Sequence, residues 1–96
     1  MTVCMETRRR IRLSLWAYAY EFENASIVDD ATFDAECRLI DLDVSTARPD
    51  MDDWWRKNFN PSSGMWIRSH PELGKLKVLF SLLFPTFDLK LWMVQP

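Results

Sequence analysis

Residues that bind metals or form disulfide bonds are scarce in this sequence. It contains one histidine, His70, and two cysteines, Cys4 and Cys37, which share no short-range spacing. A structural zinc site needs a cluster of cysteine and histidine ligands, and the sequence offers none. We therefore predict no metal site, and we expect both thiols to be reduced, as is usual in the cytoplasm.

Long hydrophobic runs and glycines are also few. The most apolar stretch, residues 78–84, is too short to span a bilayer, which needs about 20 such residues. The first residues are basic and precede an apolar run, but that run is rich in tyrosine and tryptophan and is followed by glutamates, unlike a signal peptide. With two glycines and five prolines in 96 residues, the composition favours one small helical domain over residues 1–96 without a membrane span.

Tryptophan and acidic residues are the unusual features that the sequence does have. It contains five tryptophans, and such rings either fill a core or mark a contact surface. Residues 21–53 carry eleven acidic and two basic side chains, whereas the segments on either side are net basic. Two interpretations fit this division: the flanks neutralise the acidic block within the fold, or the block is displayed to a basic partner.

Apolar residues at helical spacing predict an all-α bundle of three to four helices. The first helix has little polar face after Arg12, so we expect it at the centre of the fold. The segment between the third and fourth helices is predicted as a loop because it holds proline, glycine and serine, and the tail has a weak strand pattern. The predicted elements are helices over about 7–22, 31–44, 49–59 and 71–84, a loop over 60–70, and a C-terminal helix and tail over 71–96.

The first two predicted helices form a hairpin over about residues 7–44. Asp29 or Asp30 stands where a helix N-cap belongs, since a carboxylate there accepts hydrogen bonds from free backbone N–H groups. We expect Asp30 to fix the start of the second helix. Phe22 and Phe33 are expected to fill the seam between the two helices.

The segment "AYEFENASIVDDATFD", residues 19–34, places a Tyr-Glu pair at the end of one helix and "DATFD" at the start of the next. This pattern resembles the N-terminal helical domain of NAD-dependent DNA ligases, where a Tyr-His pair is followed by Asp-Ala-Glu-Tyr-Asp. The similarity covers about residues 11–42, under half of the chain. The positions that match the ligase motif are Tyr20, Glu21, Asp30, Phe33 and Asp34.

The resemblance implies a binding site for the nicotinamide mononucleotide (NMN) half of NAD. In the ligases the aromatic rings stack on the nicotinamide, and the carboxylates orient the rest of the ligand. Here Glu21 stands in place of the histidine, and Phe33 stands in place of the second tyrosine, which keeps the ring and removes the hydroxyl group. No Lys-x-Asp-Gly motif of a nucleotide-transfer domain is present, so we expect no enzymatic activity.

The chain also looks like short stand-alone phage proteins that share this hairpin and a segment similar to "GMWIRSHPEL". This likeness implies a non-catalytic accessory or inhibitor protein in the cytoplasm of the host cell, binding a host protein such as a nucleic-acid-handling or defence enzyme. No cofactor is expected under this interpretation. The residues expected to contact the host protein are acidic or aromatic: Asp41, Asp43, Asp50, Asp52, Asp53, Trp54 and Trp66.

The alternative interpretation is a stand-alone module that binds NMN or NAD through the five residues matching the ligase motif.

The sequence disfavours catalysis, calcium binding and direct nucleic-acid binding. His70 lies near serines but lacks an orienting carboxylate and a nucleophile elbow, and the carboxylates at 29, 30 and 34 lack calcium-loop spacing. The "RRRIR" run is short in an acidic chain, so we expect it to pair with the acidic block and predict no direct nucleic-acid binding. The sequence also allows a homodimer that forms through the apolar tail and the surplus tryptophans.

Overall fold

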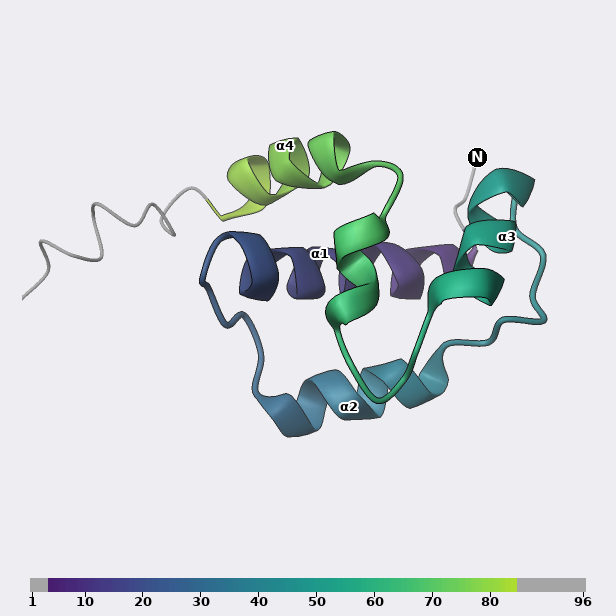
Figure 1. Ribbon diagram of the computed structural model, residues 1–96, viewed down its shortest axis with the longest axis horizontal. Helices are drawn as coiled ribbons and strands as arrows, with labels where there is room; N and C mark the ends of the chain where they lie inside the picture. The colour runs from purple at the N-terminus through teal and green to yellow at the C-terminus, as the bar shows by residue number, and fades with distance from the viewer. Residues whose placement is uncertain (1–3, 85–96) are drawn as a thin grey trace, which may run out of the picture.

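The computed structural model describes residues 4–84, which form four α-helices and one short 3-10 helix without a β-strand (Figure 1). This arrangement confirms the all-α prediction. The strand pattern predicted in the tail lies outside the described residues. In chain order the elements are α1 (Met5–Phe22), α2 (Asp30–Leu39), α3 (Pro49–Asn58), η1 (Met65–Ser69) and α4 (Leu73–Leu83).

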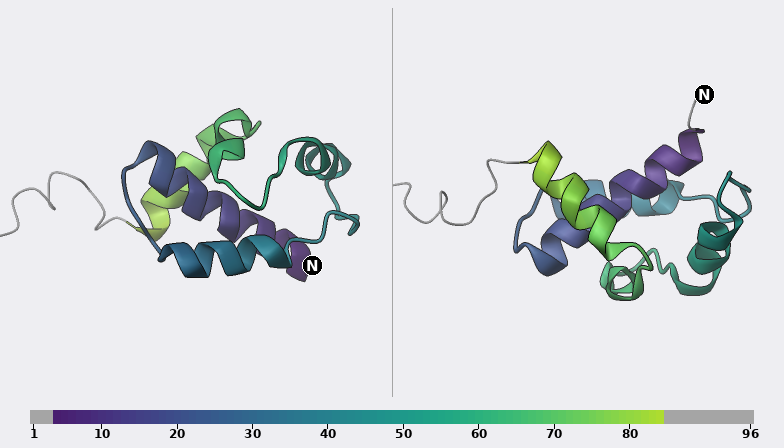
Figure 2. Two further views of the ribbon diagram at one scale, coloured as in Figure 1. Left: turned by 60° about the horizontal axis from the view of Figure 1, so that its bottom comes forward. Right: turned by 90° about the horizontal axis from the view of Figure 1, so that it is seen from above.

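Helix α1 is the centre of the fold, as the sequence predicts. It lies between α2 and α4, and η1 packs against it as well (Figures 1 and 2). Because neighbours cover several of its sides, the stretch 13–19 is buried almost all the way round, as the low exposure of Leu13, Leu15, Ala17, Tyr18 and Ala19 shows. A helix that is apolar on most faces is stable only in such a position.

Helices α1 and α2 run antiparallel and are joined by residues 23–29 (Figure 1). The N-cap of α2 is Asp29, whose Oδ1 accepts the backbone N–H of Thr32 at 2.8 Å. Asp30 is the first helical residue, so the expectation that it fixes the start of α2 is wrong. Phe22 does not fill the seam either: it is 47% exposed at the end of α1, where its ring stacks on Tyr18.

Helix α2 ends at Leu39, five residues before the predicted end at Val44. The cause is tertiary, since the N–H of Asp41, which would continue the helix by donating to the carbonyl of Cys37, donates instead to Glu6 Oε2 of α1 at 3.1 Å. Arg10 donates to the carbonyl oxygens of Asp41 and Val44 at 2.8 and 3.2 Å, and Arg56 donates to that of Leu42 at 2.7 Å. These bonds hold the segment after Leu39 in a non-helical path.

The predicted loop over 60–70 contains η1, whose Trp66 and Ile67 are buried. Trp66 packs on Trp55 of α3, with ring centroids 4.9 Å apart. Trp54 is half-buried and donates its indole N–H to the carbonyl of Ser69 at 3.1 Å. These tryptophans therefore join α3 and η1 to the core.

Ion pairs between the basic N-terminal segment and the acidic block are part of the fold. Arg10 binds Glu6 and Asp52, each at 2.8 Å, and all three side chains are about 95% buried. At the surface Arg12 binds Glu36 at 2.6 Å. Arginines of the basic N-terminal segment therefore neutralise part of the acidic block within the fold.

None of the helices in the described residues is both long and apolar enough to cross a membrane.

Candidate functional site

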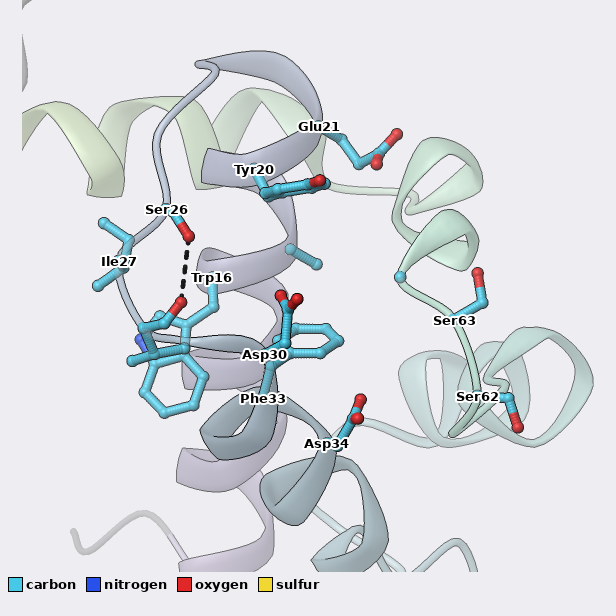
Figure 3. Close-up of a pocket in the computed structure, with 13 residues that line it drawn as sticks. Trp16, Tyr20, Glu21, Ser26, Ile27, Asp30, Phe33, Asp34, Ser62 and Ser63 are labelled. Atoms are coloured by element: carbon cyan, nitrogen blue, oxygen red, sulfur yellow. Dashed lines mark hydrogen bonds between the residues drawn. The ribbon is translucent and has the colours of Figure 1, made fainter.

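An open cleft of about 200 Å³ lies where α1, α2 and the chain before η1 meet (Figure 3). Its lining comes from the C-terminal half of α1, from residues 26–28, from the first turns of α2 and from residues 62–64. The structure brings all five residues of the ligase-like motif to this cleft: Tyr20, Glu21, Asp30, Phe33 and Asp34.

The turn between α1 and α2 shapes one end of the cleft. Asn24 adopts a left-handed backbone conformation with φ of 53°, which asparagine tolerates better than most residues. The N–H of Ala25 then returns to the carbonyl of Ala19 at 3.0 Å, and the hydroxyl of Ser26 donates to the carbonyl of Val28 at 3.1 Å (Figure 3). The chain thereby reverses tightly, and α2 begins opposite the last turns of α1.

Asp30 and Asp34 are four residues apart on α2 and therefore share one face of that helix. In Figure 3 this face is turned toward Tyr20 and Ser63. Most carboxylates in residues 4–84 accept a hydrogen bond or form an ion pair, but those of Asp30 and Asp34 do neither, and the same is true of Asp43 on the surface. The cleft thus has two carboxylates free to bind a ligand.

Glu21 is held differently. Its carboxylate binds Arg68 of η1 at 2.9 Å, and its side chain is only 13% exposed. This pair ties the end of α1 to η1. Because Arg68 is not itself part of the lining, the cleft has three acidic side chains and no lysine, arginine or histidine.

Three aromatic rings complete the walls. Tyr20 is 63% exposed at the last turn of α1, while Trp16, one turn earlier, and Phe33 of α2 are half-buried. At Gly64 the chain passes beside Phe33, and a Cβ at this position would stand 3.6 Å from the ring, an ordinary van der Waals contact. The Arg12 guanidinium lies over the Trp16 ring, 5.5 Å from its centroid. A planar ligand that enters the cleft therefore meets ring faces and carboxylates together.

The residues predicted to contact a host protein are not gathered in one surface. Asp52 and Trp66 are buried, with 3% and 6% exposure, so they are not available to a partner in this fold. Asp52 is used internally: burial tends to raise its pKa, but hydrogen bonds from Thr46 and Arg10 outweigh this effect and hold the pKa below its usual value.

Four of the predicted aspartates, at positions 41, 43, 50 and 53, are exposed. Two of these have basic partners next to them. Asp50 binds Arg48 at 2.8 Å, and this hydrogen-bonded pair lowers the pKa of Asp50 to about 2. Asp53 binds Lys57 at 3.2 Å. The exposed acidic surface is therefore weaker in charge than the sequence alone indicates.

His70 is buried at the side of the Trp54 ring, with ring centroids 4.9 Å apart. Its Nδ1 accepts the backbone N–H of Glu72 at 3.0 Å, and burial lowers the pKa of His70 to about 4. A neutral imidazole in this position supports the start of α4. Residues 4–84 contain no group of three or more side chains placed to hold a metal ion.

Some features of the surface were not predicted from sequence. Trp16 belongs to the candidate cleft, and its spacing of four residues from Tyr20 is the signal that could have revealed it. A second, more apolar cleft of about 230 Å³ lies between α1, α3 and α4, with Ile11, Met51 and Leu79 among its lining residues. Its walls come from segments far apart in the chain, so no local pattern predicts it.

Comparison with known protein families, curated proteins and solved structures found no match for this chain. The likeness to the ligase domain and to phage proteins therefore stays an expectation drawn from the motif residues.

Proposed function

We propose that the chain is a small non-catalytic module that binds a nicotinamide nucleotide, NMN or NAD, in the cleft between α1 and α2. One observation carries the proposal. The five residues singled out by the ligase-like motif come from two helices, and they line one cleft together with a further aromatic ring, that of Trp16.

The chemistry of the cleft suits the nicotinamide riboside part of such a ligand. The rings of Tyr20 and Phe33 offer flat faces on which the nicotinamide can stack. The carboxylates of Asp30 and Asp34 have no partner within the described residues, and they can accept hydrogen bonds from ribose hydroxyls and from the carboxamide NH2 group. The cleft is open and small, so it would cover the ring and ribose and leave the remainder of NAD in solvent, which favours modest affinity.

The direct test is calorimetric titration of NMN into the full chain. We expect saturable binding at about millimolar ligand or below. Replacing the exposed ring in Tyr20→Leu removes one stacking face, and we expect binding to weaken by about tenfold, in line with the usual contribution of aromatic stacking to base binding.

The matched control is Phe22→Leu, which removes another half-exposed ring at the same end of α1 but outside the cleft lining. Its affinity for NMN should equal that of the unmodified chain. Absence of any heat of binding up to several times the expected concentration range, from a chain shown to be folded, would eliminate the proposal.

A second candidate function is docking to a host protein, as a phage-type inhibitor would require. The observation that favours it is the exposure of four aspartates between positions 41 and 53. The test is capture from a bacterial lysate at low and high salt, with a chain carrying Asp→Asn at all four positions as the control. Retention of one protein that is lost in high salt and in the control supports docking, because interactions between exposed charges are screened. If the control retains the same protein, the acidic surface is not the contact.

A further inference from the structure

The cleft carries an excess of negative charge, which restricts the charge of the ligand that it can bind. Glu21, Asp30 and Asp34 belong to the lining, which contains no basic side chain. Arg68 compensates Glu21 from outside the lining, whereas Asp30 and Asp34 have no cation beside them. Such a cleft attracts cationic groups of a ligand and repels anionic ones.

The aromatic walls act in the same direction. The face of an aromatic ring attracts a cation electrostatically, and tryptophan and tyrosine do so more strongly than phenylalanine. One such contact is already present at the edge of the cleft, where the Arg12 guanidinium lies 5.5 Å from the centroid of Trp16. Tyr20 is largely exposed and has no ring partner or hydrogen bond within residues 4–84, so its face is free for a ligand.

An anionic group has no comparable place to bind here. The start of α2 would ordinarily attract a phosphate through its free N–H groups. In this chain the Asp29 carboxylate already occupies that position and accepts the N–H of Thr32 at 2.8 Å, and Asp30 follows it. A phosphate at the start of α2 would therefore meet carboxylates, and the donors left to it in the lining are the neutral hydroxyl groups of Tyr20, Ser62 and Ser63.

We infer that the cleft recognises the positive charge of a pyridinium ring, so that its preferred ligand is an oxidised, N-substituted nicotinamide nucleoside without a phosphate. The oxidised ring is a cation, and hydride addition at the ring carbon makes it neutral. Nicotinamide riboside should therefore bind at least as tightly as NMN, and reduced NMN should bind poorly. This inference rests on the proposed function and specifies which form of the ligand the same cleft accepts.

The experiment compares three ligands by calorimetry with the full chain: nicotinamide riboside, oxidised NMN and reduced NMN. We expect the riboside to bind about threefold or more tightly than oxidised NMN, and reduced NMN to bind about tenfold more weakly than oxidised NMN, the size of change that cation–aromatic and charge–charge contacts at a partly exposed site produce.

A double variant, Asp30→Asn with Asp34→Asn, keeps the shape of the cleft and removes its uncompensated charge. Because the aromatic rings remain, it should reduce the preference for oxidised over reduced NMN from about tenfold to about threefold. Asp43→Asn is the matched control, because Asp43 is also exposed and unpartnered in the described residues but lies outside the cleft. It should leave all three affinities unchanged.

The outcomes separate this inference from the proposed function. Equal affinity for oxidised and reduced NMN, or tighter binding of NMN than of the riboside, would overturn the charge preference while leaving nicotinamide binding intact. If none of the three ligands binds to the folded chain, the proposed function fails and the inference fails with it. A preference for oxidised NMN that keeps its full size in the double variant would also overturn the inference, since the carboxylates would then not contribute to it.

Discussion

Replacing Arg10 with methionine removes the cation shared by two buried carboxylates. The guanidinium binds Glu6 and Asp52 at 2.8 Å each and also donates to the carbonyls of Asp41 and Val44. Removing one partner of a buried ion pair typically costs about 3–5 kcal/mol, because the remaining charge stays buried without compensation. We therefore expect Arg10→Met to lower the free energy of unfolding by about 4 kcal/mol, a large share of the roughly 5–15 kcal/mol that a domain possesses.

The assay is urea denaturation at pH 7, followed by tryptophan fluorescence. Trp55 is a suitable reporter because its ring lies 5.9 Å from the Arg10 guanidinium and is buried. The matched control is Arg8→Met, on the same helix at an exposed position, for which we expect a change within about 0.5 kcal/mol.

The pH dependence of the loss gives a second check. The folded-state pKa of Asp52 is below its usual value, so the stability that its carboxylate contributes is complete above the unfolded-state pKa of about 3.9 and is lost as the pH falls through the folded-state pKa. Arg10→Met removes one cause of this shift. The difference in stability between the variant and the unmodified chain should therefore shrink below about pH 4. A loss under about 1 kcal/mol at pH 7, or a difference that grows in acid, would refute the reasoning.

Three further predictions concern a cap, a buried base and the thiols. Asp29→Ala should lower the thermal midpoint more than Asp30→Ala does, since only Asp29 accepts the Thr32 N–H at the start of α2; equal losses would contradict this assignment. The folded-state pKa of His70 is about 4, below the usual 6.5, so its neutral form is favoured and stability should fall by at most about 3 kcal/mol between pH 6.5 and pH 4. His70→Asn, which can keep an acceptor for the Glu72 N–H, should flatten that fall in denaturation curves, and an unchanged slope would exclude His70 as its source. A thiol reagent should modify Cys4 well before Cys37. Cys4 is exposed and hydrogen bonds from Thr7 lower its pKa, whereas Cys37 is buried and burial raises its pKa to about 11. Equal rates of modification in the folded chain would argue against the packing of α2.

The helices and their order could be predicted from sequence because each is encoded locally. The spacing of apolar residues predicts α1 to within two residues of its start, and Pro49 begins α3 as its fixed φ and missing N–H favour. The predicted residues of the candidate cleft also come together, since Tyr20 and Asp30 lie on either side of a short turn whose reversal is itself local. For such features the neighbouring residues carry most of the information.

Tertiary contacts decided what the sequence pattern left open or predicted wrongly. Helix α2 stops early because the N–H of Asp41, which would continue it, donates to Glu6 of α1. Asp52 and Trp66 are core residues because Arg10 and Trp55 lie beside them. Residue type alone makes an aspartate or a tryptophan suitable for either a surface or a core. Which of the two it occupies depends on whether a partner reaches it in space, and only the folded chain determines that.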